Sequence, residues 1–378
     1  MNIVLWVLFL FFFEMKQLKV YLFLYILVAS SCNRNNTIIV NESECIVDSF
    51  DVPVKGSRFR TWTNNIDNSV FGQSGSQVWQ FEKSNAVKFL DSNNLDQNDI
   101  FKISNKYFLD NRGNDINLIN ANGMVLQQNV KTLKRFRHNG KLYLCQFSSS
   151  NSFLPLGENQ FIVMLLYADE KEQSSFKDYL QNSDSNKLGL FAVEDDTIRF
   201  IKPIDFMPHK SFFKNNKTVN YFSHSLSKSK DEIYILYDFH NEIFRLSSNF
   251  KILNPIPLPK QLNFKFYNNT SDSINTFAKV MRSQIVGSKN FKVSYNSHRN
   301  ILYVITMNGM DPEKEYKIDE GLEDFYWNAS VFNLNDNQWS RIIHFTPKQD
   351  IRNIQFLDEY FIVKSSKKND AKFYKYKF

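Results

Sequence analysis

The chain has 378 residues with a hydrophobic fraction of 43 % and a formal net charge of +7. This length is enough for a sizeable core in one large domain or two ordinary ones, and three cysteines are too few for a disulfide-stabilised scaffold. The lysines are interleaved with Asp and Glu along the chain, which indicates solvated faces instead of a basic groove, so we expect no nucleic-acid partner.

Two apolar runs open the chain, and Glu14 ends the first of them. The second, Tyr21–Val28, follows two lysines and precedes the small residues Ala29–Ser31. A cationic segment, a short apolar run and small residues follow one another in this order in signal peptides. The second run is too short to cross a bilayer, which takes about 20 residues. We therefore expect residues 1–31 to be a signal peptide, with translation starting at Met15.

A cysteine, Cys32, directly follows the small residues, and this stretch resembles the lipobox of bacterial lipoproteins. In that family the cysteine is acylated and the leader is cut just before it, so the resemblance implies a lipid anchor at Cys32. Several acyl chains hold a soluble domain stably on a membrane, whereas one chain binds only marginally. Two alternatives remain open: plain secretion with cleavage near Ser31, and an uncleaved leader that would make the protein a membrane-bound sensor.

The segment after the cysteine, residues 32–50, is polar and short of core residues, which predicts a tether. Some lipoproteins of the Bacteroidota type carry an acidic run directly after the cysteine that directs them to the cell surface, and no such run stands here. By this resemblance we expect a protein of the bacterial cell envelope that is anchored to a membrane, such as the outer membrane, and faces the periplasm. Residues 51–378 are then the folded domain.

Helical periodicity is scarce in the rest of the chain, and we predict short helices only over Glu170–Ser183 and Ser271–Ile285. Elsewhere, short apolar or alternating runs rich in Ile, Val, Phe and Tyr are separated by Asn, Asp, Ser and Gly, which is the pattern of β-strands. Strand–turn–strand units are predicted within residues 76–91, 106–128, 188–204, 231–258 and 353–378, and a further unit begins at 299–310 and is completed at 328–346 after an insertion.

These units recur with a period of roughly 40 to 50 residues, which is typical of propeller blades. A blade is a four-stranded antiparallel sheet that cannot bury its faces alone. The sequence therefore predicts an all-β fold, a β-propeller of about six or seven four-stranded blades after the leader. A pair of β-sandwiches and an irregular all-β fold remain alternatives.

The lipobox and strand pairs such as "IYILYDFHNEIFRLSSNFKIL" together are similar to the six-bladed propeller lipoproteins of the Bacteroidota, which include a widespread family of unknown function. The resemblance covers most of Phe71–Phe378 and implies the propeller fold. That family has no agreed catalytic residues, so the resemblance assigns none to this chain.

No motif for catalysis, metal or cofactor stands in the sequence. The histidines lack a tight metal-binding spacing, and we expect no metal and no cofactor; they are His138, His209, His224, His240, His298 and His344. Carboxylates gather in Glu194–Asp196 and Asp238–Glu242, but we predict that both groups lie in hairpin turns, where they do not face each other as glycoside hydrolysis requires. Cys45 and Cys145 form a disulfide or remain free thiols.

Aromatic and acidic residues end a long insertion near residue 325, where we predict a weak binding site at Tyr326, Trp327, Glu323 and Asp324. A loop that rises from a propeller face often forms a binding rim. Packing of these aromatics within a blade is the alternative. We expect a non-catalytic binding or scaffold module for a protein, peptide or glycan, and the competing hypothesis is a hydrolase or lyase acting on a glycan or peptide in the propeller channel.

Overall fold

Strands make up most of the described part of the computed structural model, and the helical turns among the described residues are short 3-10 segments. The structure describes residues 37–51, 60–63, 70–74, 77–82, 85–91, 99–111, 115–146, 152–168, 186–205, 224–238, 240–263, 288–309, 326–346, 349–357, 360–365 and 372–377. The expected signal peptide, Cys32, Glu323, Asp324 and the helices predicted over Glu170–Ser183 and Ser271–Ile285 lie outside these residues.

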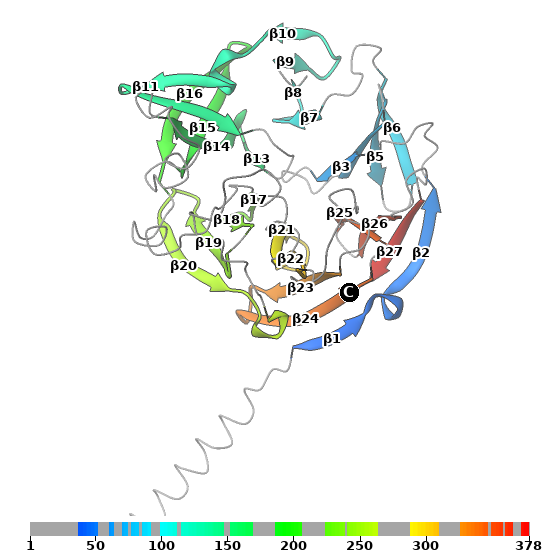
Figure 1. Cartoon of the computed structure of the whole chain (residues 1–378). Helices are drawn as coiled ribbons and strands as arrows, with labels where there is room; N and C mark the ends of the chain where they lie inside the picture. The colour runs from blue at the N-terminus through cyan, green and yellow to red at the C-terminus, as the bar shows by residue number, and fades with distance from the viewer. Residues whose placement is uncertain are drawn as a thin grey trace, which may run out of the picture. The chain divides into compact units, whose positions relative to one another are not determined.

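The described strands form six antiparallel sheets, which we number in chain order (Figure 1). Sheet 1 contains β3 (Arg60–Thr63), β4 (Val70–Ser74), β5 (Gln77–Glu82) and β6 (Asn85–Asp91). Sheet 2 contains β7 (Asp99–Lys102), β8 (Tyr107–Asn111), β9 (Ile116–Asn120) and β10 (Val125–Gln127). Sheet 3 contains β11 (Arg135–His138), β12 (Lys141–Gln146), β13 (Phe153–Gly157), β14 (Gln160–Ala168), β15 (Asn186–Glu194) and β16 (Thr197–Ile204).

The second half of the chain repeats this plan. Sheet 4 contains β17 (His224–Lys228), β18 (Glu232–Tyr237), β19 (Glu242–Ser247) and β20 (Ile252–Pro257). Sheet 5 contains β21 (Lys289–Asn296), β22 (Ile301–Met307), β23 (Trp327–Asn333), β24 (Gln338–Phe345) and, beside β24, β1 (Ile38–Asn41). Sheet 6 contains β25 (Gln349–Phe356), β26 (Tyr360–Ser365), β27 (Lys372–Lys377) and, beside β27, β2 (Ile46–Asp51).

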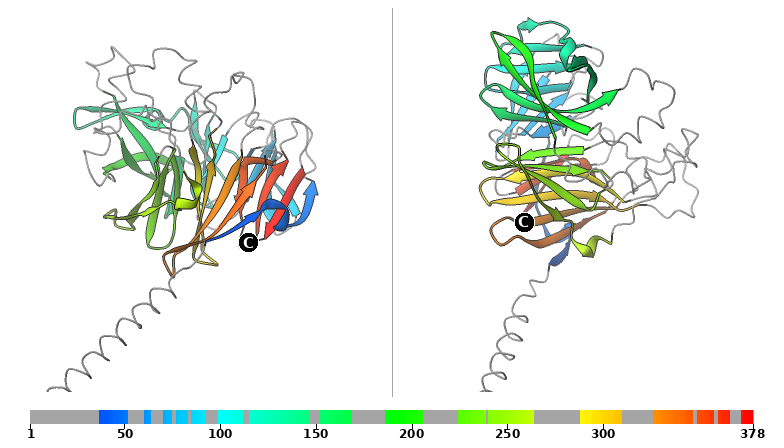
Figure 2. Two further views of the ribbon diagram at one scale, coloured as in Figure 1. Left: turned by 60° about the horizontal axis from the view of Figure 1, so that its bottom comes forward. Right: turned by 90° about the vertical axis from the view of Figure 1, so that its left-hand side faces the viewer.

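Within the unit Ile39–Phe378, one edge strand from each of sheets 4, 5, 6 and 1 lies against that of the next sheet. Strand β17 contacts β21, β21 contacts β25, and β25 contacts β3. Figure 2 shows sheets 4 and 5, coloured yellow-green and yellow to orange, side by side. Separate antiparallel sheets whose inner edge strands meet are the arrangement of a β-propeller. The predicted all-β, propeller-like architecture is therefore confirmed.

The two ends of the described chain meet in sheet 6, where β2 pairs with β27 in antiparallel register, Ser49 opposite Tyr374. The prediction that residues 32–50 form a tether before the folded domain is therefore wrong over β1 and most of β2. Polar residues lie between the two strands, and for this reason the sequence pattern indicated a tether. Both are outer strands whose partners come from the far end of the chain, so little of their apolar surface is buried, and Val47 remains 62 % exposed.

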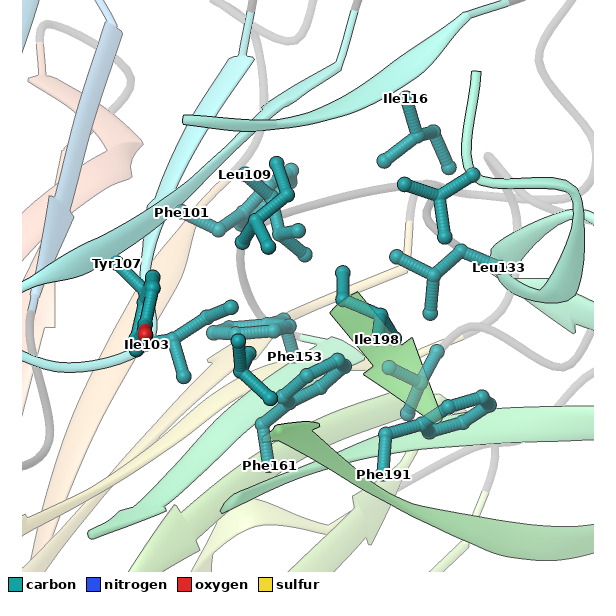
Figure 3. Close-up of a cluster of buried hydrophobic side chains, with 14 of the residues drawn as sticks. Phe101, Ile103, Tyr107, Leu109, Ile116, Leu133, Phe153, Phe161, Phe191 and Ile198 are labelled. Carbon is teal, nitrogen blue, oxygen red and sulfur yellow. The ribbon is translucent and has the colours of Figure 1, made fainter. Parts of the chain in front are cut away.

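Large apolar side chains fill the spaces between successive sheets. The cluster between sheets 2 and 3 is shown in Figure 3, where Phe153, Phe161 and Phe191 of sheet 3 lie beneath Phe101 of sheet 2. The Phe101 and Phe153 ring centroids are 5.3 Å apart, and those of Phe161 and Phe191 are 5.4 Å apart. Similar clusters join sheets 3 and 4, 4 and 5, and 5 and 6. The high aromatic content of the chain is thus used to join one sheet to the next.

The hairpin turn predicted at Glu194–Asp196 is confirmed, because Asp195 and Asp196 connect β15 to β16 with φ angles of 49° and 55°. Both cysteines described by the structure, Cys45 and Cys145, are free thiols, which decides between the two alternatives left by the sequence. Among the described residues, no helix is long and apolar enough to cross a membrane.

Candidate functional site

Two serine hydroxyls of β17 accept hydrogen bonds from backbone amides of β21. The Val293 amide donates to Ser225 Oγ at 3.0 Å, and the Tyr295 amide donates to Ser227 Oγ at 2.8 Å. Residues two apart in a strand project from the same face, so both hydroxyls point toward sheet 5. They satisfy backbone donors that would otherwise be buried without a partner, because both serines are buried.

The connection from β18 to β19 is tied to the start of β21 by one asparagine. The Asn290 amide donates to the carbonyl oxygen of Asp238 at 2.6 Å. Asn290 Nδ2 donates to the carbonyl oxygens of Tyr237, at 2.7 Å, and of His240. The register of β21 with β22 shifts between Asn290 and Lys292, which marks a β-bulge. Bulges redirect side chains near functional sites.

A buried ion pair lies beside this asparagine. Lys289 Nζ is 3.0 Å from Asp238 Oδ2, and the two side chains are 18 % and 7 % exposed. Burial raises the pKa of the Asp238 carboxyl to about 7, although the charge of Lys289 and a hydrogen bond from it act in the opposite direction. The Asp238–Glu242 segment is a connection between strands, as predicted, but its first carboxylate is buried at a junction of two sheets.

His240 lies in the same connection. Its Nδ1 accepts a hydrogen bond from the Glu242 amide at 3.2 Å, and its ring centroid is 4.9 Å from that of Phe244. Burial lowers the pKa of His240 to about 4, so the imidazole is neutral near pH 7.

A row of polar residues crosses sheet 5 from its inner edge outward. Asn290 is directly opposite Thr306, Thr306 is opposite Asn328, and Asn328 is opposite His344. On this face of the sheet, Val304 and Phe332 pack against sheet 4. The row is therefore the polar end of the space between sheets 4 and 5.

The side chain of Asn328 connects this row. Its Nδ2 donates to Thr306 Oγ1 at 3.3 Å and to Asn308 Oδ1 at 2.9 Å. Its Oδ1 lies 2.5 Å from His344 Nδ1. Thr306 and Asn328 are almost fully buried, and burial lowers the pKa of His344. These four side chains form a connected polar network at one end of the sheet.

A second junction, between sheets 5 and 6, depends on a buried lysine. Lys292 Nζ donates to the carbonyl oxygen of Ile354 at 3.0 Å and to Gln355 Oε1 at 2.8 Å. Burial lowers the pKa of Lys292 to about 7. Asn296 Nδ2 donates to the carbonyl oxygen of Leu357 at 3.0 Å in the same junction.

The two described residues of the predicted binding site lie on opposite sides of sheet 5. Tyr326 is 60 % exposed. Trp327 is 1 % exposed and packs edge-on against Phe291 with ring centroids 5.1 Å apart. Trp327 is thus a core residue, as the packing alternative expects, whereas the binding role of Tyr326 stays a prediction.

No sequence motif indicated Asn290, Asn328 or Lys292, although each interrupts an apolar strand. The sequence pattern indicated a turn at Asp238 and no metal-binding spacing at His344. Among the described residues, no group of three or more His, Cys, Asp or Glu side chains is arranged to hold a metal ion.

No protein-family model matches the chain, and no curated protein matches it. A crystal structure of a member of the DUF4221 family from Bacteroides vulgatus matches with a TM-score of 0.57 and 10 % identity, over 88 % of this chain and 97 % of that one. The fold is a β-propeller. Identity this low shows the fold alone.

Two more distant solved structures are a virginiamycin B lyase from Staphylococcus aureus and a regucalcin, a calcium-binding protein, from Agrobacterium tumefaciens. The lyase matches with a TM-score of 0.37 and 11 % identity, over 88 % of this chain and 98 % of that one. The regucalcin matches with a TM-score of 0.39 and 7 % identity, over 90 % of this chain and 95 % of that one. Both TM-scores lie below 0.5, so neither match assigns a property to this chain.

Proposed function

We propose that this protein is a lipid-anchored, extracytoplasmic propeller of six blades, one for each sheet, that binds a protein, peptide or glycan without catalysing a reaction on it. The observation that carries this proposal is the use of the polar groups on the innermost strands. The hydroxyls of Ser225 and Ser227 accept hydrogen bonds from backbone amides of sheet 5. The ammonium group of Lys292 donates one to a side chain of sheet 6. Groups engaged in such junctions hold blades together and are not aimed at a common reacting atom.

The sequence supports the anchor through the signal-peptide pattern and Cys32. Strand β1 begins at Ile38, six residues after that cysteine, and it already pairs with β24 of the propeller. A short link of this kind would keep the propeller close to the membrane to which the acyl chains bind. The location follows from the anchor: the cell envelope on the periplasmic side, with secretion as the alternative.

The intact mass of protein extracted from membranes tests the anchor, with Cys32→Ala as the matched variant. We expect the mass of residues 32–378 plus acyl chains, and we expect Cys32→Ala to lose both the added mass and membrane association. An unacylated mass would leave the secreted form, and an intact leader would leave a membrane-spanning form.

Binding without turnover is tested by exposing the full chain to panels of oligosaccharides and peptides while following both retention and product formation. We expect retention of one class of ligand and no new product by mass spectrometry. Conversion of a retained ligand would reject the non-catalytic proposal.

A hydrolase or lyase that acts on a glycan or peptide is the second candidate, and Asp238 is the observation that favours it. A carboxyl group with a pKa near 7 beside a lysine is suited to general acid–base catalysis at neutral pH. If product does form, Asp238→Asn should abolish it, because the amide cannot transfer the proton.

A further inference from the structure

The hydrogen bonds of Asn328 determine which nitrogen of His344 carries a hydrogen. Asn328 Nδ2 donates to Asn308 Oδ1 and Thr306 Oγ1, so its Oδ1 is the atom that faces His344 Nδ1. An amide oxygen is only an acceptor, so Nδ1 must be the donor. A neutral imidazole with hydrogen on Nδ1 presents an unprotonated Nε2. The network therefore prepares His344 Nε2 as a hydrogen-bond acceptor.

A potential donor lies at the same end of sheet 5 as this acceptor. Asn308 Oδ1 accepts a hydrogen bond from Asn328 Nδ2, so Asn308 Nδ2 points away from that bond. Within the described part of the chain, neither Asn308 Nδ2 nor His344 Nε2 has a hydrogen-bond partner. The side chains of Asn308 and His344 contact opposite ends of the Asn328 carboxamide, through Asn308 Oδ1 and His344 Nδ1, so both side chains lie at the same end of sheet 5.

An exposed aromatic ring completes the group. Tyr326 precedes Asn328 by two residues, and its carbonyl oxygen accepts a hydrogen bond from the Asn308 amide at 2.9 Å. Side chains two residues apart in an extended segment lie on the same face. Tyr326 is therefore on the face that carries Asn328 and His344, and its ring is 60 % exposed.

We propose that the end of sheet 5 formed by His344, Asn308 and Tyr326 binds a neutral saccharide, with His344 Nε2 accepting a hydrogen bond from a sugar hydroxyl. A hydroxyl is both donor and acceptor, so sugar hydroxyls match both the imidazole nitrogen and the amide N–H group. The electron-rich face of the tyrosine ring attracts the weakly positive C–H groups of a sugar ring. Asn328 is a positioning residue in this site, because it acts through His344.

This inference rests on the proposed binding function and names its ligand class. Its first test needs no ligand. The long-range proton–nitrogen NMR spectrum of the full chain distinguishes hydrogen on Nδ1 from hydrogen on Nε2, and His344→Asn assigns the signal. We expect the Nδ1–H form at neutral pH, and the Nε2–H form would overturn the proposal.

The second test is calorimetric titration of the full chain with maltohexaose, cellohexaose and chitohexaose. We expect at least one of them to bind and His344→Asn to raise its Kd at least tenfold. Asparagine retains a donor close to the position of Nδ1, so the contact with Asn328 persists while the Nε2 acceptor is lost. His298→Asn, at an exposed histidine in the turn between β21 and β22, is the matched control and should leave the Kd unchanged.

The outcomes separate the two proposals. Saccharide binding that His344→Asn leaves unaltered would overturn this site while the binding function stands. Binding of peptides but of none of the three sugars would also overturn the saccharide site and leave the binding function standing. Absence of both saccharide and peptide binding would overturn the proposed function itself.

Discussion

Asn290 and Asp238 join two sheets of the propeller through their main chains, because the Asn290 amide donates to the Asp238 carbonyl oxygen at 2.6 Å. The same two residues also contribute side chains to the junction, an amide bound to two carbonyl oxygens and a carboxylate paired with Lys289. The junction between sheets 4 and 5 thus combines structural hydrogen bonds with the one carboxyl group that favours an enzymatic alternative.

Replacing Asn290 with alanine should destabilise the protein by about 1–3 kcal/mol, because the buried carbonyl oxygens of Tyr237 and His240 lose their donor. The free energy of unfolding from urea titration measures this cost. Asn254→Ala, at an exposed position of β20, is the control and should change stability by less than about 0.5 kcal/mol. Equal effects of the two substitutions would show that the Asn290 amide does not support the junction.

Asp238 should make the protein less stable as pH rises toward neutrality. Its folded pKa of about 7 lies above the ordinary value of 3.8, so the folded state holds a proton that the unfolded state has already lost. This contribution is fully present below about pH 4 and is lost as pH rises to about 7, with an upper limit of about 4 kcal/mol. Comparing urea unfolding of the wild type and Asp238→Asn across this range isolates the effect, and parallel curves would contradict it.

Lys292 should make the protein more stable as pH rises above neutrality. Burial lowers its folded pKa to about 7 from 10.5, so the unfolded state binds more protons between these values and stability rises with pH. Between about pH 7 and 9.5 the gain should reach about 3 kcal/mol. Lys292→Met removes the titrating group, so its unfolding free energy should rise less over this interval. An unchanged slope would mean that the Lys292 ammonium group keeps an ordinary pKa.

The pairing of β2 with β27 should be essential for cooperative unfolding. Removing residues 1–51 would leave β27 as an open edge strand, and we expect a Tm lower by at least about 8 °C or aggregation. Removing residues 1–36 should shift Tm by no more than about 2 °C, because no described strand is lost. Differential scanning calorimetry of the two truncated chains makes the comparison, and similar Tm values would argue against closure by β2.

The sequence by itself determined the class of fold. The runs around Ile233–Tyr237 and Glu242–Leu246 have strand character because of their apolar and β-branched residues, and the structure has β18 and β19 there. The turn at Asp195 could also be predicted, because local backbone preferences determine where such turns form. The recurrence of these pairs was enough to predict a propeller.

Only the tertiary structure decided which strands pair across long distances and which polar residues meet. Strands β1 and β2 resembled a tether because their partners, β24 and β27, lie some 300 residues further along the chain. Asn290, Thr306, Asn328 and His344 are separate polar residues in the sequence, and they form one row only because strand register places them opposite one another. Register is set by long-range pairing and burial, to which local sequence preference does not extend.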